Sequence, residues 1–273
     1  MNFDIILLSI IQGLTEFLPV SSSAHLALAP RLLGLTEYGL DMDAFLHLGT
    51  LFAAIIYFRK EILAMLSSFV IASTAKPSNA ESKAINRKLA LAILLATIPA
   101  VIIGFSFKDF FGSDLVRSSY GIAITLVLGS LLMFIADHYA KQQTQNKEIS
   151  ELGYTEIFFI GIMQCLALFP GVSRSGSTIS AGLFASLNRE QAARFSFIVG
   201  LPAIGGAGLL ALKDLLTSPI METSLDYQEL GIGFLVSFIS GYLAIDFMIK
   251  FLKNHSLTWF IVYRIILAGF IIL

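Results

Sequence analysis

The sequence predicts an all-α polytopic membrane protein, and its composition and charge distribution are the basis for this. Hydrophobic residues make up 56% of the 273 positions and charged residues only 14%, whereas soluble domains average about 25% charged residues. Mean hydropathy is +0.81. The charges gather in short clusters between apolar runs that approach the ~20 residues needed to cross a bilayer. The net charge of −1 gives no indication of a nucleic-acid partner.

Several apolar runs are long enough to cross a bilayer unaided. We predict six transmembrane helices within residues 42–58, 89–107, 118–137, 191–212, 229–249 and 257–273. Residues 61–74 are apolar but short, which favours a position at the membrane interface. Polar linkers are predicted at 76–88 and 138–152. Residues 1–17 lack a basic region and contain Glu16, so we expect them to be mature protein and not a signal peptide.

Two more apolar stretches, 2–33 and 153–188, are interrupted by Pro, Gly and runs of Ser. When the first is shifted by 152 positions, six of twelve residues match, where chance predicts about one. The matching pairs are Gln12/Gln164, Leu14/Leu166, Phe17/Phe169, Val20/Val172, Ser21/Ser173 and Ser23/Ser175. The segments that follow match with a shift of 150. We interpret this as a duplication within a single membrane domain, with repeat one at 1–137 and repeat two at 153–273.

Broken helices at corresponding positions of two repeats are typical of a binding site at the repeat interface. Non-helical backbone at membrane depth persists only where protein or a water-filled cavity satisfies its N–H and C=O groups. We therefore predict two re-entrant helix-loop-helix hairpins, with tips at Phe17–Ser23 and Phe169–Ser175.

The distribution of basic residues predicts the orientation. If residues 61–74 do not cross, twelve basic residues fall on one side of the membrane and four on the other; if they cross, the division is eleven and five. The first arrangement also gives the two repeats opposite orientations. It makes the twelve-residue side cytoplasmic, places both termini in the periplasm, and produces an inverted-topology repeat. The twelve are Arg59, Lys60, Lys76, Lys83, Arg87, Lys88, Lys141, Lys147, Arg189, Arg194, Lys250 and Lys253.

The hairpins carry the residues that are best suited to chemistry. The first supplies a carboxylate, hydroxyls and an imidazole, and the second a guanidinium and hydroxyls. The first set comprises Gln12, Glu16, Ser21, Ser22, Ser23 and His25; the second comprises Ser173, Arg174, Ser175, Ser177 and Thr178. A helix that begins after a serine presents free N–H groups to an anion, and an arginine adds a two-pronged donor for phosphate.

Simpler explanations exist for each feature. Glu16 and Arg174 each cost roughly 2.5–3.5 kcal/mol at the bilayer centre, so they are expected either to serve a site or to pair as a clamp between the repeats. The serines also fit tight helix packing, and a lone histidine is often a core residue. Asp43 and His47 are four residues apart and are expected only to bond each other. Arg264, in the last span, is expected to snorkel or to contact a carbonyl.

The two motifs resemble the signatures of the bacterial undecaprenyl-diphosphate phosphatases of the BacA/UppP type. Gln12–His25 resembles the first signature and Pro170–Thr178, which reads PGVSRSGST, resembles the second. The resemblance extends over most of the chain, including Arg189–Pro202. It implies hydrolysis of undecaprenyl diphosphate to undecaprenyl phosphate and inorganic phosphate in the bacterial inner membrane. The lipid carrier is thereby recycled for cell-wall synthesis, and the cell resists bacitracin, which binds the diphosphate.

The resemblance also implies dependence on a divalent cation, Mg²⁺ or Ca²⁺, for which oxygen ligands such as Glu16 are suited. Gln12 stands where many members have glutamate, so a cation is expected to depend mainly on Glu16 and on substrate oxygens. We favour Ser22 as the nucleophile with His25 as its base, while direct attack by His25 or by water stays open. Glu16 is expected to bind the metal or to orient His25, and Arg174 to neutralise the phosphoryl group.

The hydroxyls of Ser21, Ser173, Ser175 and Thr178 are expected to bind the diphosphate, in a site open to the periplasm. The expected partners are a polyprenyl diphosphate and membrane lipid, and the sequence leaves a homodimer open. Inverted repeats with broken helices are equally an architecture of secondary transporters. A transporter and a lipid flippase with the same site are therefore the competing hypotheses.

Overall fold

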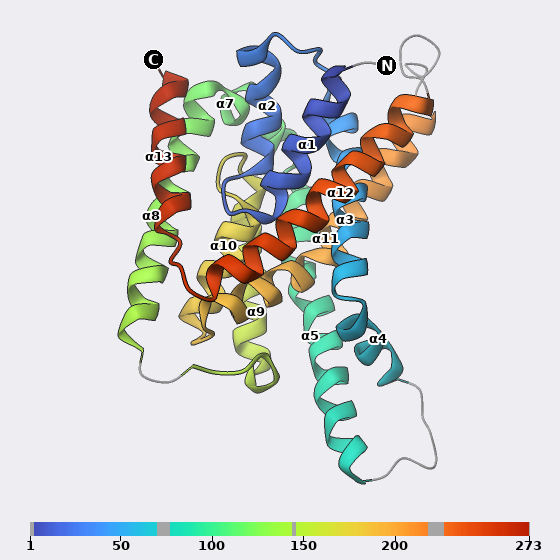
Figure 1. The fold of residues 1–273 in the computed structure, drawn as a ribbon, viewed down its shortest axis with the longest axis vertical. Coiled ribbons are helices and arrows are strands. Elements are labelled where there is room, and N and C mark those ends of the chain that lie inside the picture. Colours follow the sequence, from blue (N-terminus) through green and yellow to red (C-terminus); the bar gives the residue numbers. More distant parts are fainter. Residues whose placement is uncertain (1–2, 70–76, 144–145, 218–226, 273) are drawn as a thin grey trace.

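The computed structural model describes residues 3–69, 77–143, 146–217 and 227–272; the regular secondary structure in these ranges is helical, apart from one isolated bridge between Lys147 and Leu187. Figure 1 shows the arrangement. The α-helices are α1 Phe3–Phe17, α2 Ser22–Leu33, α3 Leu40–Tyr57, α4 Arg59–Ser67, α5 Pro77–Ser106, α6 Lys108–Phe111, α7 Asp114–Arg117, α8 Ser119–Gln142, α9 Tyr154–Gln164, α10 Arg174–Phe184, α11 Arg189–Thr217, α12 Tyr227–Leu252 and α13 Thr258–Ile272. The 3₁₀ turns η1, Ile149–Glu151, and η2, Cys165–Leu168, precede and follow α9.

The predicted all-α polytopic membrane fold is confirmed at the level of class. Four described helices, α5, α8, α11 and α12, are long and apolar enough to cross a membrane. The predicted runs at 42–58 and 257–273 correspond to shorter apolar helices, α3 and α13. The count of six spans stays a prediction.

The predicted polar linker at 76–88 is wrong where the structure describes it, because α5 begins at Pro77 and continues to Ser106. Proline suits a first helical position, since its missing N–H would have no partner there. Lys76 lies outside the described residues. The interfacial segment predicted at 61–74 corresponds to α4, which ends at Ser67, and residues 70–74 lie outside the described ranges.

Both interrupted stretches form two helices joined by a short loop, as the Pro, Gly and Ser residues indicated. Ser21 and Ser173 occupy the left-handed region, with φ values of 75° and 76°, a conformation uncommon for residues other than glycine. Each caps the helix that follows: Ser21 Oγ accepts from Ala24 N at 3.4 Å, and Ser173 Oγ accepts from Gly176 N at 3.1 Å. The two matched serines therefore end the two loops in the same way.

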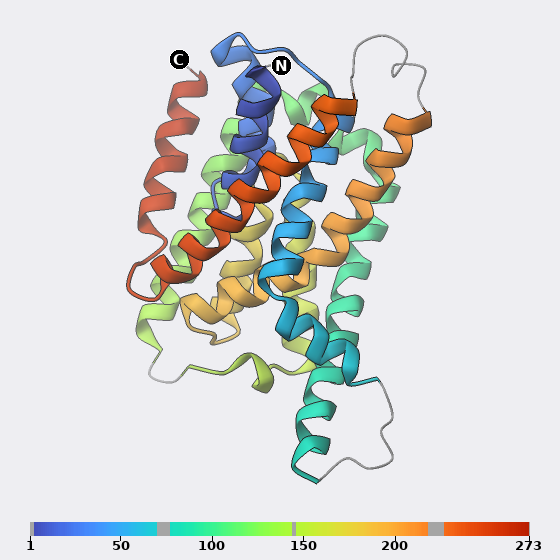
Figure 2. The ribbon, with the colours of Figure 1, turned by 45° about the vertical axis from the view of Figure 1, so that its right-hand side comes forward.

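The α1–α2 hairpin descends from the end of the molecule where both termini lie, and the α9–α10 hairpin rises from the opposite end, so that their loops meet inside the bundle (Figure 1). The helices around them correspond as well, since α1 packs on α12 and α9 packs on α5 (Figure 2). Glycines allow both approaches. A Cβ at Gly13 would lie 1.8 Å from Ser240 Oγ, and one at Gly161 would lie 2.3 Å from Ala96 O.

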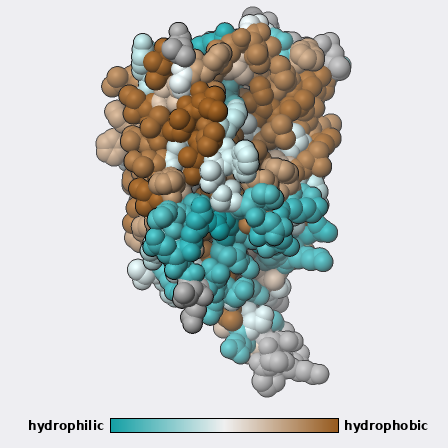
Figure 3. Space-filling view, turned by 60° about the vertical axis from the view of Figure 1, so that its left-hand side comes forward, coloured by the Kyte–Doolittle hydropathy of each residue, from teal (hydrophilic) through white to brown (hydrophobic). Residues whose placement is uncertain are grey.

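The outer surface is strongly apolar. Large side chains such as Phe105, Leu115 and Ile266 are more than half exposed, and Figure 3 shows a broad hydrophobic surface above a hydrophilic region. A soluble monomer rarely exposes so large an apolar area, whereas lipid tails cover such a surface in a membrane protein. The polar residues of the hairpins lie inside this apolar shell.

Candidate active site

Glu16, at the end of α1, is the centre of the polar cluster. Its carboxylate is buried and receives hydrogen bonds or ion pairs from four side chains on α1, α2, α3 and α10. These are Arg174 Nη2, 3.1 Å from Oε1, and Ser22 Oγ, Gln12 Nε2 and His47 Nε2 at 2.7, 3.2 and 3.3 Å from Oε2. A buried carboxylate is stable only when such donors replace its lost hydration.

His47 also belongs to this cluster, and each of its two ring nitrogens faces an oxygen acceptor. Its Nδ1 lies 2.7 Å from the backbone oxygen of Asp43, while its Nε2 faces Glu16. Both neighbours are acceptors, and only the doubly protonated imidazolium donates from both ring nitrogens. As an imidazolium, His47 faces Glu16 together with Arg174, and the Asp43 carboxylate lies within electrostatic range of the same imidazole.

Arg174, at the first position of α10, has donor capacity to spare. Its Nη2 binds Glu16 and its Nη1 binds the backbone oxygen of Ser196 at 3.1 Å, but its Nε, although buried, has no partner. Gly200 on α11 makes room for the guanidinium, because a Cβ there would lie 1.9 Å from Nη1. Buried donors are normally paired, so the free Nε leaves one guanidinium donor available to an acceptor from a ligand.

Gln12 supplies the opposite kind of unpaired group. It is fully buried, its Nε2 donates to Glu16, and its Oε1 has no partner. A carboxylate beside a free amide oxygen fits a hard divalent cation. No group of three or more His, Cys, Asp or Glu in the described ranges could hold a metal ion. A cation here would therefore depend on Glu16, Gln12 and oxygens brought by the ligand, and its presence stays a prediction.

His25 differs from the expected arrangement. Its Nδ1 lies 2.8 Å from the backbone oxygen of Ser21 and its Nε2 lies 2.6 Å from the hydroxyl of Tyr263, so Nδ1 carries the proton and Nε2 accepts. The expected partner, Ser22, donates its hydroxyl to Glu16 instead. The structure thus pairs the predicted nucleophile with the carboxylate and not with the imidazole.

Two of the remaining predicted hydroxyls, those of Ser21 and Ser175, join the two hairpins. Gly171 N donates to Ser21 Oγ at 3.1 Å and Ser175 Oγ donates to Leu18 O at 3.2 Å, so each loop binds the other. The other bonds are Ser21 to Ser23 and Ser173 to Ser175, both at 3.1 Å, and Thr178 to the Arg174 oxygen at 2.8 Å and to Ser196 Oγ at 2.5 Å. All of these hydroxyls except that of Ser23 are buried, and binding of the diphosphate by Ser21, Ser173, Ser175 and Thr178 stays a prediction.

Sequence reasoning missed two participants, and one expectation held. His47 was expected only to bond Asp43, and Tyr263 was not considered. Arg264 was expected to snorkel or to contact a carbonyl; it contacts two in the hairpin loops, at Pro19 and Gly171. Glu16 and His47 are 31 positions apart in the sequence, and no sequence pattern indicated their contact.

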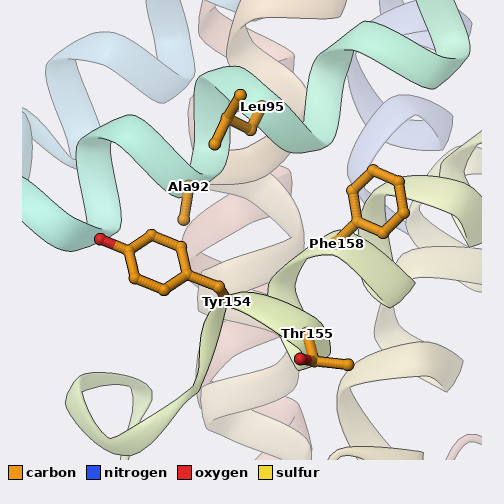
Figure 4. Close-up of a pocket in the computed structure, with 5 residues that line it drawn as sticks. All are labelled: Ala92, Leu95, Tyr154, Thr155 and Phe158. Atoms are coloured by element: carbon orange, nitrogen blue, oxygen red, sulfur yellow. The ribbon is translucent and has the colours of Figure 1, made fainter.

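The molecule also has a shallow groove on its outer surface, formed by Ala92 and Leu95 of α5 with Tyr154, Thr155 and Phe158 of α9 (Figure 4). It shares no residue with the Glu16 cluster. Its walls are apolar side chains apart from two hydroxyls, so it provides no charged group for chemistry.

The fold and the cluster together define a class: a polytopic helical membrane protein in which two broken-helix hairpins enclose a buried carboxylate, a guanidinium and a row of hydroxyls. A family model described as bacitracin resistance protein BacA matches residues 5–270. The chain therefore belongs to the BacA bacitracin-resistance family, whose members are known as phosphatases.

Proposed function

We propose that the chain hydrolyses undecaprenyl diphosphate to undecaprenyl phosphate and inorganic phosphate in the bacterial inner membrane. The observation that carries the proposal is the Glu16 cluster, in which Arg174 Nε and Gln12 Oε1 lack partners. One free donor and one free acceptor beside Glu16 and Arg174 match a ligand that brings phosphate oxygens and a bound cation. A clamp between the hairpins would require only the Glu16–Arg174 pair.

The substrate class follows from the surroundings of the cluster. An apolar surface surrounds the bundle, so a long polyprenyl chain can stay in lipid while its diphosphate reaches the hairpin loops. The charged headgroup finds compensating charge inside the bundle, where Arg174 and His47 lie. We place the opening on the periplasmic side, in agreement with the basic residues counted in the sequence.

We propose Ser22 as the nucleophile and Glu16 as the group that receives its proton, because Ser22 Oγ already donates to Glu16 Oε2 at 2.7 Å. Ser22 Oγ forms a bond to the terminal phosphorus, the bond from that phosphorus to the bridging oxygen breaks, and undecaprenyl phosphate leaves. Water then cleaves the phosphoserine and releases phosphate. Arg174 stabilises the charge on the transferred group, and a divalent cation, when held by Glu16 and Gln12, supplies further charge neutralisation.

A rapid-quench experiment tests this assignment. Purified protein is mixed with substrate labelled at the terminal phosphorus, stopped with denaturant at mildly alkaline pH, where both phosphoserine and phosphohistidine survive, and digested for mass spectrometry. We expect a phosphorylated peptide containing Ser22 that is absent from Ser22→Ala. Phosphate on His25 would show direct attack by the imidazole. Labelled phosphate released with no phosphopeptide at any time would favour attack by water.

Hairpins that enter from opposite ends also favour a second function, transport of an anion. The two functions are separated by phosphate release from a lipid diphosphate in detergent. Detergent removes the two compartments that transport requires, so a pure transporter releases no phosphate, whereas a phosphatase continues to turn over. A flippase that also hydrolyses would pass this test and would additionally move lipid between leaflets of a vesicle.

A further inference from the structure

The last helix contains a buried charge that the proposed reaction does not use. Arg264 of α13 is 0% exposed and is the largest of the fully buried side chains among the described residues. No carboxylate forms an ion pair with it in the part of the chain that the structure describes. Its guanidinium instead makes four hydrogen bonds to neutral oxygens. Burying a charge with no opposite charge beside it costs free energy.

The four acceptors show what this arginine connects. Nε donates to Ser130 Oγ at 2.9 Å and Nη2 to the backbone oxygen of Leu126 at 3.0 Å, both on α8. Nη1 donates to the oxygen of Pro19 at 3.2 Å, and Nη2 also donates to the oxygen of Gly171 at 2.8 Å. One planar group thus binds the loop of the first hairpin, the loop of the second and a long neighbouring helix.

The two loop carbonyls are close in sequence to the groups of the candidate active site. Pro19 lies midway between Glu16 and Ser22, and Gly171 precedes Arg174 by three residues. A shift of either loop would therefore change the separation of the carboxylate, the hydroxyl and the guanidinium. Hydrogen bonds between the loops, such as Gly171 N to Ser21 Oγ, fix them to each other, while Arg264 fixes both of them to the surrounding helices.

The neighbouring helix is shaped to admit the guanidinium. A Cβ at Gly129 of α8 would lie 2.3 Å from Arg264 Nη2 and 2.7 Å from the backbone oxygen of Val172. Only glycine leaves this space, so α8, α13 and the second loop approach one another at the arginine. Packing between α8 and α13 alone would be served better by apolar side chains, because an arginine must keep every donor satisfied.

We propose that Arg264 is a positioning residue for the reaction: it holds the two hairpin loops in register and so sets the geometry of Glu16, Ser22 and Arg174. This inference rests on the proposed phosphatase activity. Misplacement of reacting groups by about 1 Å costs on the order of 10²-fold in rate. Loss of the hydrogen bonds from Arg264 to the two loops, which we call the tether, therefore lowers kcat more than it raises KM.

The test compares three variants of the full chain in detergent. Arg264→Met keeps the volume and removes all donors, and Arg264→Lys keeps the charge but cannot reach both loops with a planar fork. Ser130→Ala is the matched control, because it removes one acceptor of Arg264 and leaves the bonds to Pro19 and Gly171. The readouts are kcat and KM for phosphate release, the melting temperature, and hydrogen exchange of peptides that contain residues 17–23 and 169–175.

We expect kcat to fall about 100-fold in Arg264→Met and at least tenfold in Arg264→Lys, with KM within about threefold of wild type. In both Arg264 variants, hydrogen exchange should become faster in the two loop peptides together. Ser130→Ala should keep kcat within about twofold of the wild-type value. A lower melting temperature with unchanged kcat per folded molecule, or faster exchange in one loop only, would overturn the proposal.

Hydrogen exchange separates this proposal from the proposed function, because it needs no turnover. If the wild-type chain released no phosphate, the phosphatase assignment would fail, while joint loosening of both loops would still show the tether. If Arg264→Met does not fold, Arg264→Lys provides the test. Wild-type hydrogen exchange and wild-type kcat in Arg264→Lys would show that a guanidinium bonded to both loops is not needed.

Discussion

Gly200→Ala is predicted to inactivate the protein without unfolding it. The added Cβ would lie 1.9 Å from Arg174 Nη1 and 2.5 Å from its Cζ. Ordinary contact begins near 3.4 Å, so the guanidinium must retreat by about 1.5 Å. Because this group is the end of a flexible side chain, the helix can keep its place while the arginine moves.

The retreat would break the 3.1 Å contacts of Arg174 with Glu16 and Ser196. A displacement of about 1 Å at a catalytic group costs on the order of 10²-fold in rate, which corresponds to about 2.7 kcal/mol of transition-state stabilisation. The assay is kcat for phosphate release by purified protein, with the melting temperature measured in parallel. We expect kcat to fall about 100-fold and the melting temperature to change little.

Gly206→Ala is the matched control on the same helix, because nothing lies within 4 Å of its added Cβ. This variant should keep wild-type kcat, and alanine should stabilise the helix slightly. The reasoning is refuted if Gly200→Ala retains more than half of the wild-type kcat while folded. It is equally refuted if both glycine variants lose activity to the same extent.

Three further predictions concern charge, metal and orientation. Arg174→Lys should lower kcat at least tenfold, because a point charge cannot bind Glu16 and a phosphate together; wild-type activity would remove the two-pronged role. Gln12→Glu should tighten Mn²⁺ or Ca²⁺ binding about tenfold in calorimetry without substrate, since a second carboxylate joins Glu16, and unchanged affinity would exclude Gln12 as a ligand. With the native cysteine replaced by serine, Ser82→Cys should be protected from a membrane-impermeant thiol reagent in intact cells and Leu115→Cys should react; the reverse pattern would invert the predicted orientation.

The sequence was sufficient to predict the hairpins, because their cause is local. Proline, glycine and serine interrupt the apolar runs at matched positions, and backbone broken at membrane depth needs protein or water to satisfy it. The two motifs are also short and local in sequence. On the assumption that they face each other, they predicted that Glu16, Ser22 and Arg174 belong to one site. The start of α5 was missed, since residues 77–88 are polar and show none of the apolar composition of a spanning helix.

The contacts that sequence could not predict are those between distant helices. His47 reaches Glu16 from α3, and Tyr263 reaches His25 from α13 across 238 positions. Each contact depends on the angle and distance at which the helices cross. Small residues influence this geometry: Gly13 and Gly49, for example, allow α12 to approach α1 and α3. The pairing of Ser22 with Glu16 in place of His25 has the same origin, because Tyr263 holds the imidazole.

The central claim is that the cluster around Glu16 and Arg174 hydrolyses a polyprenyl diphosphate. The most direct measurement follows inorganic phosphate and undecaprenyl phosphate together, by colorimetry and mass spectrometry, for the purified wild-type chain and Arg174→Ala in detergent with Mg²⁺. The account predicts equal amounts of both products from the wild type and a loss of at least 100-fold in Arg174→Ala. Binding of the substrate without either product, or undiminished turnover in Arg174→Ala, would contradict it.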